Sequence, residues 1–216
     1  RPVRFGDVQG VIGIKAVHLT TAAERRTMPK TKDLYIDIGA ASKAAAEDKV
    51  SLGDYGVFDS AVVEFGDGLI KAKAIDDRVG CAALLKLIED EPPIDTWFCF
   101  TVQEEVGLRG AASMAYALDP GFAMVLEGTT AADLAEVEGG KAVCRVRGGV
   151  VLPFMDGATI YDAELFELLR NACDKRGIRW QTKTRVAGGT DAGRIHKSRA
   201  GVRVCAAAAP VRYIYS

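Results

Sequence analysis

Acidic residues follow apolar segments at three places in this sequence. Asp76 and Asp77 come after LIKAKAI, Glu104 and Glu105 after WFCFTVQ, and Glu127 after FAMVL. If these segments are neighbouring strands, their carboxyl ends bring the five carboxylates to one edge of a sheet. Carboxylates crowded in this way raise one another's pKa unless a divalent cation neutralises them. The pattern therefore predicts a metal site, and oxygen ligands alone do not distinguish zinc, cobalt, manganese or magnesium.

A second interpretation of the same residues needs no metal. Acidic residues often lie in the first turn of a helix, where the helix dipole favours negative charge. Asp77 and Glu104 both stand close to segments with helical periodicity, so each could have this role alone. The spacing of the residues leaves both interpretations open.

The elements that would position these carboxylates alternate between helix and strand from Ala74 onward. The apolar spacing predicts helices at 76–92, 108–118, 162–177 and 190–200, and strands at 95–102, 121–127, 141–146, 179–186 and 201–209. Asp162 is placed to cap the helix at 162–177, and Gly177 is placed to end it. This alternation predicts an α/β domain over 74–216, with helices on both faces of a mostly parallel, mixed sheet.

Residues 1–73 have a different pattern and are predicted to form a smaller, β-rich domain. Short segments with β-branched or alternating residues lie at 8–17, 33–39, 61–65 and 69–74. Ser42 is placed as the N-cap of one short helix at 41–49. The chain begins and ends abruptly beside apparent strands, which predicts that an N-terminal part is missing and that both domains are incomplete.

Composition narrows the class of protein. The 28 Lys and Arg residues nearly balance the 29 Asp and Glu residues and are scattered, which argues against nucleic acid as a partner. The five cysteines form no C-x-x-C pair, as expected for reduced thiols. No apolar run approaches the roughly 20 residues of a membrane span. We therefore expect a cytoplasmic protein with no membrane partner.

Six sequence motifs together resemble a known family. They are AIDDRVGCAALL, FTVQEEVGLRGA, VLEGTTAAD, FMDGATIYD, VAGGTDAGRIH and VRYIYS. In this order and spacing they resemble the glutamyl aminopeptidase family of dinuclear metallopeptidases, metallopeptidase family forty-two, which includes the tetrahedral aminopeptidases and some members named endoglucanase. The resemblance covers essentially the whole chain. It implies a three-layer α/β/α domain, with residues 1–73 as a PDZ-like inserted domain that mediates oligomerisation.

The resemblance also implies a role for each of the five carboxylates. Asp76 would bridge two divalent metal ions, with zinc or cobalt expected and manganese or magnesium possible, and Asp77 would orient it. Glu105 would bind one ion and Glu127 the other. Glu104 would be the general base in the hydrolysis of N-terminal residues from peptides, with self-association to dimers or dodecamers. Two cations that polarise water and carbonyl groups, beside an unligated carboxylate, suit that reaction.

Two positions depart from the family's pattern. Its first metal ligand is a histidine in a segment that would precede Arg1, and its last is a histidine where this chain has Tyr215. Tyrosine binds metal only as a phenolate, and its ordinary pKa is about 10. Each metal would thus lose one ligand, which predicts weak metal binding or impaired activity. His18 and His196 are not obvious replacements.

The GGTD segment is the remaining candidate for substrate binding. In the family this loop lies near the substrate, so Gly188, Gly189, Thr190 and Asp191 would shape the pocket. Alternatively, Thr190 or Asp191 merely caps the following helix.

Two alternative functions are also consistent with the sequence. One is a noncatalytic assembly or peptide-binding fragment, suggested by Tyr215 and the absent segment. The other is an endoglucanase-like glycosidase that uses two carboxylates and no metal.

Overall fold

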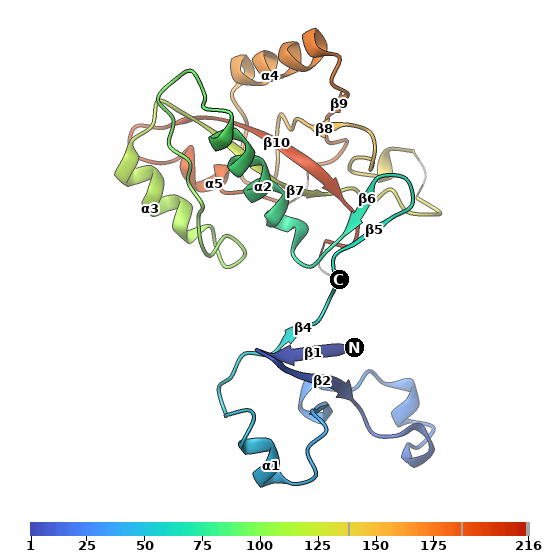
Figure 1. Cartoon of the computed structure of the whole chain (residues 1–216). Coiled ribbons are helices and arrows are strands. Elements are labelled where there is room, and N and C mark those ends of the chain that lie inside the picture. The colour runs from blue at the N-terminus through green and yellow to red at the C-terminus, as the bar shows by residue number, and fades with distance from the viewer. Residues whose placement is uncertain (138, 187, 215–216) are drawn as a thin grey trace. The chain divides into compact units, whose positions relative to one another are not determined.

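The computed structural model describes residues 1–137, 139–186 and 188–214. The chain divides into two compact units, Arg1–Lys73 and Ala74–Ser216, which are described separately (Figure 1).

The first unit is built from short antiparallel strands. Its four-stranded sheet has the order β3-β2-β1-β4, and a separate hairpin pairs β5 with β6. The strands are β1 (Pro2–Phe5), β2 (Val8–Gly13), β3 (Tyr35–Asp37), β4 (Val57–Phe58), β5 (Val63–Phe65) and β6 (Leu69–Lys71). Each of the four segments predicted to be extended in this part of the sequence contains one of these strands.

Local capping explains the helical turns of this unit. Helix α1 (Lys43–Glu47) begins after Ser42, whose hydroxyl accepts a hydrogen bond from Ala45 N at 3.2 Å, as predicted. Three 3-10 turns, η1 (Val17–Leu19), η2 (Glu24–Arg26) and η3 (Thr31–Asp33), complete the unit's helical residues.

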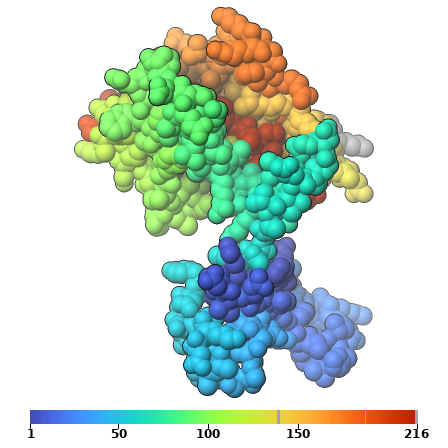
Figure 2. Space-filling model, in the orientation of Figure 1, coloured from blue at the N-terminus to red at the C-terminus, as the bar shows by residue number. Residues whose placement is uncertain are grey.

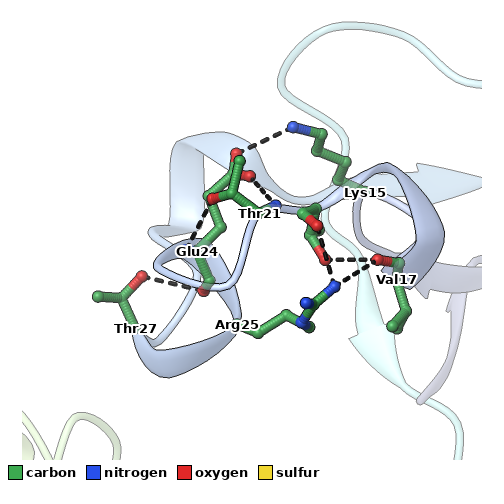
Figure 3. Close-up of polar contacts among 7 residues, drawn as sticks. Lys15, Val17, Thr21, Glu24, Arg25 and Thr27 are labelled. Atoms are coloured by element: carbon green, nitrogen blue, oxygen red, sulfur yellow. Dashed lines mark hydrogen bonds and ion pairs between the residues drawn. The ribbon is translucent and has the colours of Figure 1, made fainter.

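The turn η2 is held by reciprocal bonds between Thr21 and Glu24 (Figure 3). The Glu24 carboxylate accepts a hydrogen bond from Thr21 N at 2.6 Å, and Thr21 Oγ1 accepts one from Glu24 N at 3.2 Å. Lys15 Nζ lies 2.9 Å from the same carboxylate. The hydrogen bond from the Thr21 backbone, together with Lys15, lowers the pKa of Glu24 to about 2.

In its described residues, the second unit has four α-helices and one four-stranded sheet. The helices are α2 (Ile75–Glu89), α3 (Arg109–Leu118), α4 (Ala163–Arg176) and α5 (Ala192–Ile195), with a 3-10 turn η4 (Gly139–Lys141). The strands are β7 (Phe122–Thr130), β8 (Val150–Val151), β9 (Trp180–Gln181) and β10 (Arg203–Val211). Three of these helices fall within the segments where the sequence predicts them, and α2 begins one residue earlier than predicted.

The sheet of the second unit is mixed, in the order β7-β10-β8-β9. β10 runs parallel to β7 along all nine residues and antiparallel to β8, and β8 runs parallel to β9. Helices and loops cover most of β10, which reaches the surface of Figure 2 only as small red patches. The α/β class predicted from the sequence is therefore confirmed.

Alternating side chains on β7 and β10 pack against helices on opposite faces of the sheet. Ala206 and Val204 join a buried cluster with residues of α3 and α5, including Ala111 and Ile195. On the other side Leu126 lies against α2, which packs on β7 (Figure 1). This arrangement follows from the period of two along a strand.

Helix α4 shows why capping residues predict helix bounds well. Asp162 Oδ1 accepts a hydrogen bond from Leu165 N at 3.0 Å, and Gly177 ends the helix with a φ of 64°. Asp162 also accepts bonds from the Arg203 guanidinium at 2.7 and 2.8 Å, which attaches the start of α4 to β10.

Three predicted strands are wrong or mostly wrong. Residues 95–102 and 141–146 contain no strand, and only Trp180–Gln181 is a strand within 179–186. A strand requires a hydrogen-bonded partner, and apolar alternation alone does not supply one. In the described part of the chain, no helix is long and apolar enough to cross a membrane.

The buried cluster predicts a clear stability difference between two isoleucines. Ile195 in α5 is 3% exposed, whereas Ile160 is 78% exposed. We expect Ile195→Ala to lower the free energy of unfolding by about 2–5 kcal/mol, because it leaves a cavity in the core. Urea denaturation followed by circular dichroism measures this, with Ile160→Ala as the control. Equal losses in the two variants would contradict the assigned core.

An ion pair fixes the chain just after β10. The Arg212 guanidinium donates to Asp133 Oδ1 at 2.7 Å and to Oδ2 at 3.0 Å, and Asp133 Oδ2 also accepts from Val146 N at 2.9 Å. The hydrogen bond from Arg212 holds the pKa of Asp133 below its ordinary value.

This lowered pKa makes a prediction for stability against pH. The Asp133 carboxylate contributes stability above its ordinary pKa of about 4, and that contribution is lost as pH falls through the lower folded value. Asp133→Asn should therefore destabilise the protein by about 1–3 kcal/mol at neutral pH and by less in acid. Denaturation curves from pH 2 to pH 7 test this, beside the exposed Asp95→Asn. A difference that grew in acid would refute the assignment.

Candidate acidic centre

Asp76 and Asp77 lie at the start of α2, against β7. Both have non-helical backbone angles, and a cis peptide bond joins them. The backbone of Gly128 faces the Asp76 carboxylate and partly offsets the rise in its pKa that burial causes. A Cβ on Gly128 would lie 3.1 Å from the Asp76 Cβ and 3.3 Å from its Oδ1. Glycine at position 128 therefore lets the start of α2 approach β7 closely.

The carboxylate of Asp77 points toward the following turn of α2. Its Oδ1 accepts a hydrogen bond from Gly80 N at 3.0 Å. A Cβ on Gly80 would collide with this carboxylate and with the carbonyl oxygen of Leu126 in β7. Asp77 therefore accepts a hydrogen bond within the first turn of α2, as the second interpretation expects. It also remains close enough to the other carboxylates for their charges to affect its pKa.

The Glu104–Glu105 pair lies in a loop rather than at the end of a strand. The Glu104 carbonyl accepts hydrogen bonds from Gly107 N at 3.1 Å and Leu108 N at 2.9 Å, which forms the turn that leads into α3. The expectation of a strand before this pair is wrong, because residues 95–102 form no ladder in the described structure.

Glu127 lies inside β7, which continues to Thr130. The sequence places it at a strand end, and that expectation is also wrong. The run GTT after Glu127 remains in the strand because it pairs with the last residues of β10. Glu127 pairs with Ala208, so its side chain lies on the sheet face that carries the buried Val151.

Burial and mutual repulsion raise the pKa of most of these carboxyl groups. Burial raises the pKa of Asp77 to about 6, and burial with the charges of Asp191 and Glu105 raises that of Glu104 to about 7. Burial places the pKa of Glu127 well above its ordinary range, and Asp76 adds to the rise. The pKa of Asp76 is raised by burial and by Glu105.

These electrostatic interactions link all five predicted carboxylates into one acidic centre. We use this name for Asp76, Asp77, Glu104, Glu105 and Glu127. The residues come from the start of α2, the loop before α3 and the interior of β7, so the fold brings them together from three different kinds of element. The carboxylates selected from the sequence thus influence one another, although two of the three groups lie on elements other than the predicted strand ends.

The segment predicted to bind substrate is tied to the FMDGATIY segment through buried hydrogen bonds. Asp156 Oδ1 accepts from Ala158 N and Thr159 N, each at 2.8 Å, and its Oδ2 accepts from the Tyr161 hydroxyl at 2.6 Å. The Tyr161 hydroxyl lies 3.2 Å from Thr190 Oγ1.

Two further bonds shape the loop at the predicted substrate residues. Gly157 N donates to the Gly188 carbonyl at 2.8 Å, and a Cβ on Gly189 would lie 3.3 Å from that of Ala158. Thr190 Oγ1 accepts from Ala192 N at 3.1 Å, so Thr190 does cap α5.

Asp191 interacts electrostatically with two residues of the acidic centre. It precedes α5 but makes no side-chain cap bond. One oxygen, Oδ2, accepts a hydrogen bond from Thr101 Oγ1 at 2.5 Å, while Oδ1 is buried and has no partner among the described residues. Burial raises the pKa of Asp191, and its charge in turn raises the pKa values of Glu104 and Asp77.

The acidic centre fits a divalent cation in charge but is not arranged as a finished site. Asp76, Glu104 and Glu127 are half-buried, and Asp77 and Glu105 are exposed. Carboxylates that repel one another are the donors expected around such an ion. However, within residues 1–137, 139–186 and 188–214, no three His, Cys, Asp or Glu side chains form a group able to hold a metal ion. Tyr215, predicted to replace a ligand, lies outside the described residues.

Neither histidine joins the acidic centre in the described contacts. His18 lies exposed in the turn η1. His196 follows α5, and its Nδ1 lies 2.7 Å from the carbonyl oxygen of Ala192, one turn earlier.

Sequence reasoning missed three buried residues around the centre. Asp156 and Tyr161 support the predicted substrate loop, and the Asp-Gly turn at 156–157 was a usable signal for the first. Lys183 is 7% exposed, and its charge opposes the rise in the pKa of Glu127. Its surroundings in the sequence, QTKTR, carry no sign of burial.

The chain was compared with known protein families and structures. An acidic centre beside a mixed sheet is consistent with a hydrolase that acts through carboxylates and a cation. The profile of the M42 glutamyl aminopeptidase family matches residues 3–216. The chain belongs to this family of peptidase hydrolases, whose members are metal-dependent.

Similar proteins agree with the family. A putative aminopeptidase of Acetivibrio thermocellus is 36% identical over 209 residues, which are 96% of this chain and 62% of that protein. The structure of an aminopeptidase from the archaeon Desulfurococcus kamchatkensis has a TM-score of 0.88 and 35% identity, over 100% of this chain and 61% of that one. The Pyrococcus horikoshii TET1 peptidase, which assembles into a tetrahedron or a large octahedral shell, has a TM-score of 0.76 and 29% identity, over 97% and 62%. The chain thus spans about three fifths of these relatives' length.

The buried network predicts that the Tyr161 hydroxyl supports the substrate loop. Tyr161→Phe leaves Asp156 Oδ2 without its donor, which should lower the free energy of unfolding by about 1–3 kcal/mol. Tyr116→Phe is the control because Tyr116 is 64% exposed. Urea denaturation measures the free energy of unfolding of both variants. Equal free energies of unfolding in the two variants would show that the Tyr161 hydroxyl does not stabilise the protein.

Proposed function

We propose that this protein is a metal-dependent aminopeptidase that hydrolyses N-terminal residues of peptides. The observation that carries the proposal is the convergence of Asp76, Glu104, Glu105 and Glu127 in one acidic centre of a chain that belongs to the M42 family. The names of its relatives support the same activity.

Three carboxylates are the proposed metal ligands. Asp76 would be shared between two divalent ions, Glu105 would bind one of them and Glu127 the other. Asp77, held by Gly80 N, would orient Asp76. Bound ions of this kind, zinc or cobalt in our proposal, supply an activated water and polarise the scissile carbonyl.

Glu104 is the proposed general base. It lies in the loop before α3 and is half-buried. Burial raises its pKa, and the charges of Glu105, Asp76 and Asp77 add to the rise. A carboxylate that is not a metal ligand can accept a proton from the attacking water and deliver it to the leaving amine.

The loop of Gly188, Gly189, Thr190 and Asp191 is proposed to line the substrate pocket. Gly188 and Gly189 are exposed, while Thr190 is anchored by the Tyr161 network. An exposed backbone on an anchored support suits the recognition of a peptide.

Assembly belongs to the same proposal. The Pyrococcus horikoshii relative forms closed shells, and self-association of this protein through residues 1–73, as a PDZ-like domain, would be the equivalent. We also propose that the protein is located in the cytoplasm.

Substituting Glu104 tests the proposed base directly. Glu104→Gln keeps the size of the side chain but removes its proton acceptor, so hydrolysis of aminoacyl anilides should fall about 10²- to 10⁴-fold. Bound metal, measured by elemental analysis, should stay at the wild-type level. Glu136→Gln, at another glutamate of the same unit, is the control.

Three outcomes would change the assignment. Full turnover in Glu104→Gln would exclude Glu104 as the base. Negligible metal in the wild-type protein would favour a noncatalytic peptide-binding or assembly fragment. Cellulose hydrolysis that survives exhaustive chelation would favour a glycosidase.

A further inference from the structure

Asp191 is a buried carboxylate with one oxygen that the protein does not use. It immediately precedes α5, and 8% of its surface is exposed. Its Oδ2 accepts a hydrogen bond from Thr101 Oγ1 at 2.5 Å, whereas its Oδ1 has no partner within residues 1–137, 139–186 and 188–214. A buried charge without a partner is costly, and a positively charged donor that reached Oδ1 would remove part of that cost.

A second buried polar atom beside α5 also lacks a partner. Thr159 is 3% exposed, and no described residue forms a hydrogen bond with its Oγ1. A Cβ on Gly193, in α5, would lie 3.6 Å from this oxygen. Most buried polar groups in folded proteins have partners, so two without them next to one short helix indicate a place that a polar ligand completes.

The loop that carries Glu104 is attached to the start of α5 on both sides of this residue. On one side Thr101 donates its hydrogen bond to Asp191. On the other side Leu108 N donates to the Glu104 carbonyl at 2.9 Å, and a Cβ on Gly193 would lie 3.3 Å from Leu108 Cδ1. These contacts hold the proposed base and the free oxygen of Asp191 in the same part of the second unit.

The amino terminus of a peptide has the chemistry that this oxygen requires. At neutral pH an α-amino group, with an ordinary pKa of about 8, is mostly a protonated ammonium with N–H donors and a positive charge. Only the Cα atom separates its nitrogen from the scissile carbonyl carbon. A group that binds it therefore has to lie near the general base. The ammonium of a lysine side chain would lie four methylene groups farther from that carbonyl, so the position of Asp191 favours the α-ammonium.

We propose that Asp191 binds the α-ammonium group of the substrate through Oδ1 and so selects peptides with a free amino terminus. The inference rests on the proposed function, because it takes Glu104 as the base of an aminopeptidase. The Thr101 hydroxyl is a positioning group that occupies Oδ2 and leaves Oδ1 for the ligand. A hydrogen bond between two charged groups is stronger than one between neutral groups, and it would be shielded from water here.

Two hydroxamates that differ only in the amino group test this role. L-leucine hydroxamate has the amino group, and 4-methylpentanehydroxamic acid lacks it. In isothermal titrations of the zinc-loaded protein, Asp191→Asn should weaken binding of the first about 10- to 100-fold and leave binding of the second unchanged. Asp95→Asn removes an exposed carboxylate and should change neither affinity. An undiminished preference for the amino compound in Asp191→Asn would overturn the inference.

Thermal melting without ligand distinguishes recognition from a structural role. Asp191→Asn removes an unpaired buried charge and keeps an acceptor for Thr101, so it should melt at the wild-type temperature or above. Thr101→Val leaves both oxygens of Asp191 without a donor and should melt at a lower temperature. If Asp191→Asn melts lower or does not fold, Asp191 serves the fold and the inference is overturned.

Bound zinc and turnover separate this inference from the proposed function. Elemental analysis should find as much zinc in Asp191→Asn as in the wild type, and a loss would make Asp191 a metal ligand and overturn the inference. If the wild type hydrolyses aminoacyl anilides while Asp191→Asn keeps its preference for the amino compound, the inference alone is refuted. If the wild type binds neither hydroxamate and hydrolyses no anilide, the proposed function fails and the inference falls with it.

Discussion

Negative charge gathered beside a hydrophobic sheet is the constraint on which the second unit depends. A buried carboxylate is costly unless donors or cations surround it. Gly80 N donates a hydrogen bond to Asp77, and the Thr101 hydroxyl donates one to Asp191. These donors are single hydrogen bonds, so they reduce the repulsion among the carboxylates without removing it. Burial, together with this repulsion, raises the pKa values of Asp77 and Glu104.

The same constraint explains the small residues around the centre. Asp76 meets β7 only because Gly128 has no side chain, and α2 meets Leu126 only because position 80 is glycine. The alanines of β10 at 206–209 keep both faces of the sheet shallow, so that helices can approach it closely. The same small residues therefore allow α2 to pack closely on the sheet and allow the carboxylates at its first turn to come together.

Prediction from sequence succeeded where the deciding interaction is local. Asp162 and Gly177 bound α4 as expected, since a cap is made within one turn. It failed for residues 95–102, because a strand depends on a partner distant in the sequence. Glu127 and the pair at 104–105 were chosen as strand ends yet lie in a strand interior and a loop. Lys183 could not be foreseen, because its burial is set by tertiary packing alone.

The two interpretations of the GGTD segment describe neighbouring residues with different roles. Thr190 caps α5 and joins Tyr161 and Asp156, so its polar atoms are satisfied by the protein. Asp191 keeps one buried oxygen without a partner among the described residues, beside carboxylates that repel it. A satisfied network can hold its shape whether or not a ligand is present. A buried oxygen without a partner gains stability when a cation or donor binds it. If the loop binds substrate as proposed, we therefore expect the ligand to interact with Asp191 rather than with Thr190.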